Sequence, residues 1–239
     1  MKKNILQLKD LYHSYNKDLD VLKSLNLNIV ENEIVSILGR SGCGKTTLLR
    51  IICGLEAPTK GTVYIDEKPV HTHLEFVPTE KRNVGLVVQE RALFPHLSVI
   101  KNVTFGLKGS SKDNYEEAMN LLRLFKVDHY SNNYPHEISS GEQQRVALAR
   151  AMAPNPHIIL MDEPFGALDR DLKVDLREEA KKIFKKKNMT AIVVSHDFED
   201  ALAMADRVAI IENGSIVQIG EPNKVLSNPV NDSIRKLLR

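Results

Sequence analysis

The feature that most constrains the fold of this chain is a Gly-rich segment between an apolar run and a helix-forming run. The apolar run is "IVSIL" (34–38), the Gly-rich segment is "GRSGCGKT" (39–46), and "KTTLLRIICGL" continues with helical apolar spacing. A short continuous apolar run is typical of a strand buried on both faces. Gly54, at the end of the helical run, supplies the glycine that commonly ends a helix. We therefore expect a strand, a tight turn and a helix in direct succession.

The Gly-rich segment has the chemistry of a phosphate-binding loop. It matches G-x-x-x-x-G-K-[ST] and has the strand before it and the helix after it that the motif requires; the alternative is a structural Gly-rich turn. Glycines let the backbone approach phosphate oxygens, and successive N–H groups at a helix N-terminus attract an anion. Lys45 is expected to reach the β- and γ-phosphates of a nucleotide, and the Thr46 hydroxyl to ligate Mg²⁺. The predicted nucleotide contacts here are Gly39, Arg40, Ser41, Gly42, Cys43, Gly44, Lys45, Thr46 and Thr47.

Two acidic residues end another apolar run, "HIILMDEP". An acidic residue at the end of a buried strand is the usual complement of a phosphate-binding loop. Asp162 is expected to hold Mg²⁺, directly or through water, and Glu163 to polarise an attacking water. Alone, this pair would be a helix cap or an exposed strand end. Downstream of the phosphate-binding loop, it predicts a hydrolytic site.

Composition and charge exclude several classes of protein. The 239 residues are 42% hydrophobic and 27% charged, as in an ordinary globular protein. With 33 basic and 31 acidic side chains, the chain gives no electrostatic reason to expect nucleic acid as a partner. "MKKNILQLKD" lacks the apolar region of a signal peptide, and no apolar run approaches the roughly 20 residues of a membrane-spanning helix. Cys43 and Cys53 suggest no disulfide framework, so a reducing cytoplasm is expected.

Strand and helix patterns alternate over most of the chain. Residues 5–30 show alternating patterns typical of antiparallel strands with one solvated face, and "GTVYID", "VGLVVQ", "HIILMD", "TAIVVSHD" and "RVAIIENGSIVQIG" indicate further strands. Helical runs separate the last three, which predicts a mostly parallel sheet with helical crossovers. "NYEEAMNLLRLFKV" and "EQQRVALARAM" are amphipathic helices with no buried strand between them. The fold class is therefore α/β, with a core over about 1–89 and 157–239 and an inserted helical subdomain over about 90–156.

Six motifs in one order resemble those of the nucleotide-binding subunit of an ABC transporter. They are "GRSGCGKT", "VVQE", "SSGEQQRVALARA", "IILMDEP", "ALD" and "VVSHD", and the resemblance covers about residues 5–225. It implies a P-loop NTPase of the ABC type, with a mostly parallel core sheet, an N-terminal antiparallel β subdomain and the helical insertion. It also implies ATP and Mg²⁺ as ligands. Many subunits of the importer branch carry a further C-terminal β-rich domain, whereas this chain stops near the end of the motor. We therefore expect a single domain over 1–239 without an additional C-terminal regulatory domain.

The resemblance also assigns roles to single residues. Gln89 matches a glutamine that ligates Mg²⁺ or contacts the attacking water, at the hinge between core and helical subdomain. His196 matches the switch histidine that contacts the γ-phosphate, and Asp169 the loop that touches the opposite subunit. Tyr15 takes the place of the aromatic residue that stacks on the base, with Tyr12 as the competing choice. The implied catalytic set is Glu163, His196, Gln89 and Lys45, and the implied metal set is Thr46, Gln89 and Asp162.

The stretch "ISSGE" (138–142), here called the signature loop, departs from the family pattern L-S-G-G-Q. Ser139 and Gly141 are kept, and they would offer a hydroxyl and a backbone N–H to the γ-phosphate of ATP on the other protomer. If Ser140 had to adopt a positive φ, the steric penalty would be roughly 1 kcal/mol. The carboxylate of Glu142 can still serve as a helix cap. Hydrolysis is expected to be retained, with slower turnover as a possibility left open by these two substitutions.

The resemblance implies a dimer and membrane partners. Two subunits, identical or related, would hold two ATP molecules, each between one phosphate-binding loop and the other subunit's signature loop. Integral membrane permease subunits would contact the Gln89 loop, "RALFPHLSV" (91–99) and the helical subdomain, and a solute-binding protein would act indirectly. The protein would be peripheral, on the cytoplasmic face of the inner membrane. "ALFPHLSVIKNVTFGL" resembles importers of iron(III), polyamines, thiamine, sulfate, molybdate or maltose, and iron(III) or a similar small solute is favoured.

Other functional classes remain as alternatives. A soluble, non-transport ABC ATPase, such as one for iron–sulfur cluster assembly, has one motor domain of this size, although "QQRVALARA" and "ALFPHLSV" resemble transport subunits. A DNA-maintenance ATPase would insert long coiled coils, and the middle of this chain has no sustained heptads. A nucleotide-binding module without useful hydrolysis is suggested by Ser140.

Cys43 is expected to be reactive because it lies inside the phosphate-binding loop. Nearby Lys45 and a helix N-terminus should lower the pKa of its thiol. Alkylation of this thiol is then expected to block ATP binding, and bound ATP to protect it.

Overall fold

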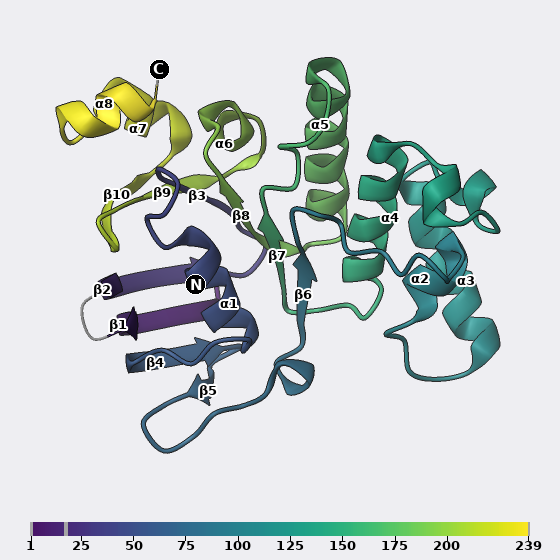
Figure 1. The fold of residues 1–239 in the computed structure, drawn as a ribbon, viewed down its shortest axis with the longest axis horizontal. Coiled ribbons are helices and arrows are strands. Elements are labelled where there is room, and N and C mark those ends of the chain that lie inside the picture. The colour runs from purple at the N-terminus through teal and green to yellow at the C-terminus, as the bar shows by residue number, and fades with distance from the viewer. Residues whose placement is uncertain (1, 17–18, 239) are drawn as a thin grey trace.

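The computed structural model describes residues 2–16 and 19–238, and its centre is a six-stranded sheet (Figure 1). The strand order is β10-β9-β3-β8-β7-β6. The strands from β9 to β6 are parallel, and β10 pairs antiparallel with β9. This confirms the mostly parallel core sheet. The strands are β3 (Ile34–Leu38), β6 (Val84–Val87), β7 (Ile158–Asp162), β8 (Thr190–Ser195), β9 (Arg207–Glu212) and β10 (Ser215–Gly220).

The continuous apolar runs of β3, β7 and β8 are explained by two cores, one on each face of this sheet. Successive side chains of a strand point to opposite faces. In β8, Ala191 and Val193 therefore enter a core shared with α5 (Arg170–Lys186). Ile192 and Val194 enter the other core, which they share with α1 (Lys45–Cys53). Both faces are covered, so no position of β8 can be polar without a buried partner.

A second sheet, formed from the N-terminal part of the chain, packs over α1. It is antiparallel, with the order β2-β1-β4-β5, as the alternating pattern predicts. Leu6, Leu8 and Leu11 of β1 lie in the same core as α1. The strands are β1 (Asn4–Asn16), β2 (Leu19–Val30), β4 (Lys60–Ile65) and β5 (Lys68–His71).

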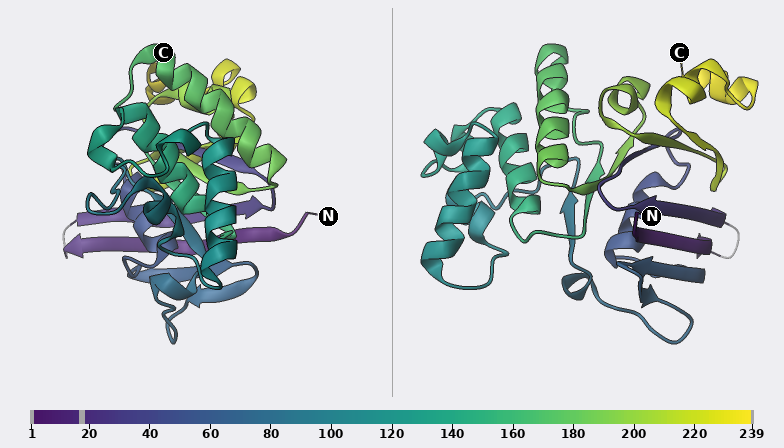
Figure 2. Two further views of the ribbon diagram at one scale, coloured as in Figure 1. Left: turned by 90° about the vertical axis from the view of Figure 1, so that its right-hand side faces the viewer. Right: turned by 180° about the vertical axis from the view of Figure 1, so that it is seen from behind.

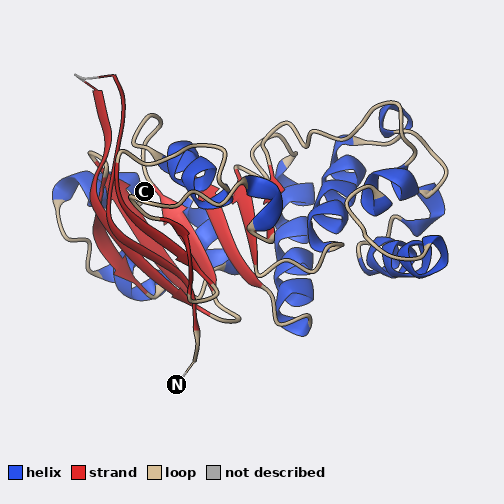
Figure 3. Cartoon of the chain, turned by 90° about the horizontal axis from the view of Figure 1, so that it is seen from below, coloured by secondary structure: helices blue, strands red, loops and turns tan. Residues whose placement is uncertain are grey.

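The chain between β6 and β7 is helical and stands at one end of the molecule (Figure 3). It contains α2 (Val99–Thr104), α3 (Ser111–Leu124) and α4 (Ser140–Met152). Residues 90–156 are all described and contain no strand. Helix α5 contacts both α4 and α6 (Phe198–Met204) and so connects this helical group to the sheet (Figure 2).

Two short helices follow β10 that the sequence patterns do not predict. They are α7 (Pro222–Ser227) and α8 (Asp232–Leu237). Ile234 of α8 is buried against Phe198 and Ala201 of α6. Six residues are too few to show a helical period, which is why their apolar positions are uninformative in the sequence. Within residues 2–16 and 19–238, no helix is long and apolar enough to cross a bilayer.

Candidate nucleotide-binding site

Three loops that carry predicted site residues leave the same edge of the core sheet. The phosphate-binding loop (39–46) follows β3, Asp162 and Glu163 stand at the end of β7, and His196 follows β8. These strands are parallel neighbours, so their carboxyl ends meet at one edge, where open α/β sheets bind ligands. The fold thus brings together residues from three distant parts of the sequence.

The phosphate-binding loop has the backbone conformation that its glycines allow. Gly42 and Gly44 have φ values of 81° and 105°, in the left-handed region that favours glycine. At Gly44 a Cβ atom would also lie 2.8 Å from Leu22 Cδ2, so a side chain here would meet the N-terminal sheet. Gly44 precedes α1 as its N-cap. The loop therefore presents backbone N–H groups at a helix N-terminus, as phosphate binding requires.

Lys45 lies across the phosphate-binding loop and is buried. Its ammonium donates hydrogen bonds to the carbonyl oxygens of Gly39 and Arg40, at 2.7 and 3.1 Å. The side chain is only 6% exposed. A positive charge is thus held inside the curve of the loop, where an anion would enter.

Asp162 and Thr46 have the donor chemistry of a magnesium site. Burial raises the pKa of the Asp162 carboxyl, and a hydrogen bond from Thr46 and the charge of Lys45 oppose this rise. Its Oδ1 atom is buried and has no hydrogen-bond partner. A carboxylate and a hydroxyl with free acceptor capacity suit Mg²⁺, which takes one or two protein ligands and completes its shell with phosphate oxygens and water. The residues present therefore fit the ion.

Glu163 and His196 form a carboxylate–imidazole pair. Glu163 Oε2 lies 2.6 Å from His196 Nδ1. The Glu163 N–H donates to Val194 O at 2.9 Å, and Glu163 has a left-handed φ of 48°, which is a strained conformation for a glutamate. The His196 side chain is 61% exposed. This arrangement places a carboxylate at the sheet edge, with its imidazole partner open to a ligand.

Tyr15, rather than Tyr12, contacts the phosphate-binding region. The Tyr15 hydroxyl lies 3.1 Å from Thr47 Oγ1 in the first turn of α1, and its ring meets His13 edge-on. The ring is 49% exposed. The structure gives Tyr12 a backbone bond to Thr59 and no side-chain link to α1 among the described residues. Tyr15 therefore has the position from which a base can be stacked.

The signature loop begins α4 through a capping box. Ser139 is the N-cap, its hydroxyl accepts from the Glu142 N–H, and Glu142 Oε2 accepts from the Ser139 N–H at 2.7 Å. Glu142 thus serves as a cap, as expected. Ser140 is the first helical residue and has no positive φ, so the steric penalty considered for it does not arise. Gly141 packs against Leu172 of α5, where a Cβ atom would lie 2.4 Å from Leu172 Cδ2.

Six predicted site residues stand apart from this cluster: the four of the signature loop (Ser139, Ser140, Gly141 and Glu142), Gln89 and Asp169. The signature loop belongs to α4, in the helical group at the end of the molecule away from α1 (Figure 1). Gln89 is exposed in a turn, because β6 ends at Val87 rather than at the glutamine. Asp169 is an exposed N-cap of α5 whose side chain makes no capping bond. Among the described residues of one chain, no hydrogen bond or ion pair links any of these side chains to the phosphate-binding loop.

The expected low pKa of Cys43 is wrong. Burial raises the pKa of its thiol, and this outweighs the lowering by Lys45 and by backbone N–H groups. Its Sγ packs beside Gly39, where a Cβ atom would be only 2.5 Å away. Both cysteines are free thiols.

We therefore predict that Cys43 reacts with iodoacetamide more slowly than a free thiol at pH 7. Because its pKa is raised, the thiolate fraction stays small at neutral pH, and the rate should rise with pH beyond the range where an ordinary thiol has levelled off. Mass spectrometry of the labelled peptide at pH 7 and pH 9 measures this rate. Faster labelling than in the denatured chain at pH 7 would contradict the burial argument. Protection by ATP stays a prediction.

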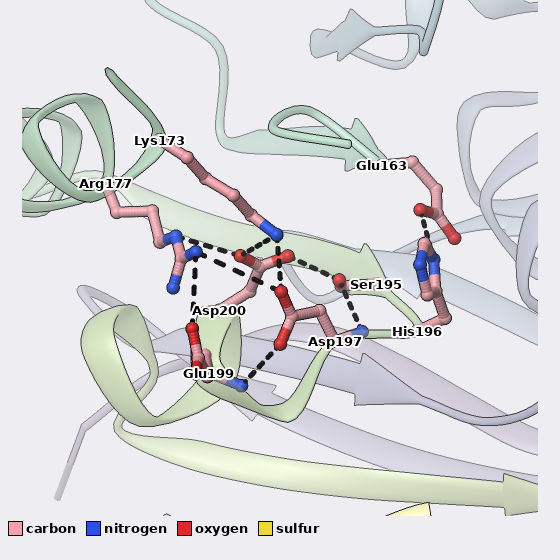
Figure 4. A network of polar contacts seen from close by, with 8 residues as sticks. All are labelled: Glu163, Lys173, Arg177, Ser195, His196, Asp197, Glu199 and Asp200. Carbon is pink, nitrogen blue, oxygen red and sulfur yellow. Dashed lines mark hydrogen bonds and ion pairs between the residues drawn. The ribbon is translucent and has the colours of Figure 1, made fainter. Parts of the chain in front are cut away.

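A buried polar cluster behind His196 has no counterpart among the predicted site residues. Lys173 and Arg177 of α5 meet Asp197 and Asp200 beside the turn of residues 195–197, here called the switch loop (Figure 4). Arg177 and Asp200 are 4% and 3% exposed. The only sequence signal is that the two cations are four residues apart on one amphipathic helix, which equally fits an exposed face.

Comparison with known proteins agrees with this geometry. The family model described as "ABC transporter" matches residues 22–166. An Fe(3+) ions import ATP-binding protein, FbpC 2 of Haemophilus influenzae, is 40% identical over 94% of this chain and 64% of its own length. A spermidine/putrescine import ATP-binding protein, PotA of Clostridium novyi, is 39% identical over 100% of this chain and 68% of its own length. The chain thus spans about 64% of the length of the first of these relatives.

Solved structures show the same fold. The dimeric ATP-binding cassette MJ0796, bound to ADP and Pi in a post-hydrolysis state, superposes with a TM-score of 0.79 and 34% identity, over 91% of this chain and 99% of that one. CbiO1 of Clostridium perfringens, part of the ABC transporter complex cbiONQ, gives a TM-score of 0.86 and 27% identity, over 99% and 95% of the two chains. The fold class inferred from the motifs is confirmed. The chain belongs to the ABC transporter family, as one of its ATP-binding cassettes.

Proposed function

We propose that this chain is the ATP-hydrolysing subunit of an ABC importer. The proposal is carried by three groups that meet at one sheet edge. They are a buried lysine in a glycine loop, a half-buried carboxylate with one buried, unpaired oxygen, and a carboxylate–imidazole pair. These are the groups needed to bind a triphosphate and to activate a water. Relatives named as import ATP-binding proteins support the same assignment.

In this proposal each side chain has one task. Lys45 leaves its two carbonyl partners to bind the β- and γ-phosphates. Glu163 accepts a proton from the attacking water, and His196, beside Glu163, contacts the γ-phosphate. Thr46, Asp162 and Gln89 would hold Mg²⁺. When bound, the ion neutralises charge that develops on the phosphates. Holding the water near a carboxylate in a site closed to solvent supplies general-base catalysis of about 10²–10⁴-fold.

The signature loop is assigned to the partner's ATP. Ser139 is the N-cap of α4 and Gly141 lies in its first turn, away from the phosphate-binding loop of the same chain. The Ser139 hydroxyl donates to Glu142 Oε2 at 2.7 Å and would exchange this acceptor for a phosphate oxygen. A γ-phosphate brought by a second subunit would complete this site through charge-assisted hydrogen bonds. Hydrolysis removes that ligand, and the dimer opens. The dimeric cassette of similar fold supports this arrangement, with either an identical or a related second subunit.

The surface for a membrane partner would be formed by the segment after Gln89. The ring centroids of Phe94 and Phe105 lie 4.4 Å apart with the rings tilted by 42°, and Phe105 is 64% exposed. Arg150 of α4 lies over the Phe94 ring and donates to the carbonyls of Arg91 and Ala92. An exposed Phe105 beside a half-buried Phe94 that a helical arginine fixes would suit an amphipathic segment of a permease. The protein would then be peripheral, on the cytoplasmic face of the inner membrane.

The domain assignment belongs to the same proposal. One ABC ATPase domain spans residues 1–239, with a core over about 1–89 and 157–239 and a helical subdomain over about 90–156. This division would let the helical subdomain carry the signature loop and the aromatic surface as one unit. The solute would be iron(III), a polyamine or a similar small solute, in line with the named relatives.

Purification from membranes, combined with an ATPase assay, tests the proposed function. We expect the chain to release phosphate from ATP in the presence of Mg²⁺ and to copurify with integral membrane subunits. Loss of the membrane partners in a Phe94→Ala/Phe105→Ala variant, with ATP binding unchanged, would support the assigned surface. Recovery of soluble scaffold proteins alone would favour the iron–sulfur assembly class instead.

The assignment of Tyr15 makes a separate prediction. Tyr15→Ala should weaken ATP binding by about 5- to 100-fold, since stacking of an aromatic ring on a base contributes roughly 1–3 kcal/mol. Tyr15→Phe should retain most of the affinity, because the ring is kept and only the bond to Thr47 is lost. Tyr12→Ala is the matched control. Titration with a fluorescent ATP analogue measures all three, and a larger effect at Tyr12 than at Tyr15 would reverse the assignment.

A further inference from the structure

The exposed ring of His196 is positioned mainly by its backbone. Its only side-chain bond to a described residue is the one to Glu163, and the ring is 61% exposed. Packing therefore does little to orient it. Its two chain neighbours are, by contrast, anchored: Ser195 is 1% exposed, and Asp197 is bonded through both its backbone and its side chain. What holds these neighbours therefore decides where the imidazole stands.

Ser195 connects the switch loop to a buried carboxylate. Its hydroxyl donates to Asp200 Oδ2 at 2.5 Å and accepts from the Asp197 N–H at 3.0 Å. The two bonds close the turn around His196, from the end of β8 to the first turn of α6 (Figure 4). Asp197 in turn caps α6 by accepting from the Glu199 N–H at 2.8 Å. The Ser195 hydroxyl thus links the residue before His196 to two residues after it, Asp197 and Asp200.

Two cations from α5 balance the acidic side of this cluster. Lys173 Nζ bonds to Asp197 Oδ2 and lies 3.4 Å from Asp200 Oδ1, and Arg177 Nε lies 3.0 Å from the same oxygen. The Lys173 side chain is 15% exposed and that of Arg177 4%. Buried charges that are paired in this way hold a defined geometry, because removing one partner leaves the other uncompensated. Helix α5 therefore fixes the turn that carries His196.

We infer that Lys173, Arg177, Asp200 and Ser195 are positioning residues that hold His196 in register with Glu163 and the γ-phosphate. The inference rests on the proposed function for the role of His196, and it adds the reason why an exposed ring keeps a defined position. None of the four side chains contacts the nucleotide in this account. They act on hydrolysis only through the backbone of residues 195–197.

Ser195→Ala is the variant that tests the inference with the least risk to folding. It deletes one hydroxyl, whereas replacing Asp200 would leave two buried cations without a counter-charge. We expect kcat to fall by about 10- to 100-fold, since small displacements of a reacting group have effects of this size. The KM for ATP should change less than about twofold, because the contacts of the phosphate-binding loop are untouched. Ser195→Thr, which keeps the hydroxyl, should restore most of kcat.

Thr190→Val is the matched control. Thr190 begins the same strand, is 3% exposed, and its hydroxyl accepts from the Asn32 N–H at 3.0 Å, far from the switch loop. The Thr190→Val variant loses one buried hydroxyl, just as Ser195→Ala does. We expect its kcat to stay within about twofold of wild type. An equal fall in both variants would overturn the inference, since the effect would then reflect general loss of stability.

A double-mutant cycle separates positioning from an independent role. In a His196→Ala background, Ser195→Ala should change kcat by less than about twofold, because the residue through which it acts is absent. If the double variant lost kcat by the product of the two single losses, the inference would be overturned. The readout that needs no activity is the NMR spectrum of the histidine rings, with the His196 signals assigned from a His196→Gln variant. The chemical shifts of the His196 ring should change in Ser195→Ala and stay the same in Thr190→Val. Unchanged shifts in Ser195→Ala would also overturn the inference.

The proposed function and the positioning role can fail separately. If the wild-type protein released no phosphate from ATP, the proposed function would fail, while the NMR comparison would still decide whether the cluster positions His196. If the wild type is active and Ser195→Ala matches it in both kcat and ring signals, only the positioning role is lost.

Discussion

Glu163→Gln is expected to bind ATP and to hydrolyse it at least about 100-fold more slowly than the wild type, since a positioned general base contributes 10²–10⁴-fold. The amide has the shape of the carboxylate and can still bond to His196 Nδ1, which lies 2.6 Å from Glu163 Oε2. It cannot accept a proton from water at neutral pH. Because binding is kept and cleavage is lost, ATP should also trap the dimer, which size-exclusion chromatography with ATP detects.

The control for this variant is Glu178→Gln on α5. Glu178 is exposed, and its one ion-pair partner among the described residues is Lys182, one turn away at 3.3 Å. Exposed pairs of this kind contribute well under about 1 kcal/mol, so phosphate release should be unchanged. If Glu163→Gln kept a rate within about threefold of wild type, Glu163 would not be the general base and the function without useful hydrolysis would regain support.

Lys45→Ala is expected to lose ATP affinity by at least about 10- to 100-fold. A hydrogen bond to a charged group contributes about 1.5–3 kcal/mol, and each 1.4 kcal/mol is tenfold in affinity. The change also removes the buried ammonium of Lys45, which lies inside the curve of the phosphate-binding loop and donates to the carbonyl oxygens of Gly39 and Arg40. Isothermal titration calorimetry with ATP and Mg²⁺ measures the loss.

Two further variants show whether this loss is specific to the ammonium. Lys81→Ala, in the exposed turn before β6, should bind ATP as the wild type does. Lys45→Arg should not restore full affinity, because the longer planar guanidinium cannot occupy the space of a compact ammonium. If a folded Lys45→Ala protein bound ATP with wild-type affinity, the loop of residues 39–46 would not be the phosphate-binding site.

Where local pattern and tertiary contact demand the same residue type, the sequence alone predicts the structure well. The segment from β3 to α1 is such a case, because the apolar run, Gly44 and Gly54 each have a local reason for their place. The parallel sheet follows from the alternation of strands and helices. The order of motifs then predicts which loops meet at the sheet edge, even though residues 46 and 162 are far apart in the chain.

Where burial decides, the sequence is not sufficient. The direction of the Cys43 pKa depends on how deeply the thiol is covered, and neighbouring charges alone predict the wrong sign. The conformation of Ser140 depends on whether α4 begins before or after it. Arg177 of α5 pairs with Asp200 of α6. The helical pattern of α5 does not predict which segment this face of the helix contacts. Each of these depends on contacts between distant segments.

Mixing two inactive variants tests the central claim, that each ATP is held by two subunits, most directly. Lys45→Ala disables the phosphate-binding loop, and Ser139→Asp places a negative charge against the γ-phosphate while keeping a residue that caps helices well. Each variant alone should be inactive, because every site of its dimer has one defective half. The mixture should regain roughly a quarter of the wild-type rate, since about half of the dimers are mixed and each of those has one intact site. Phosphate release from the mixture no greater than the sum of the two variants would contradict the shared site.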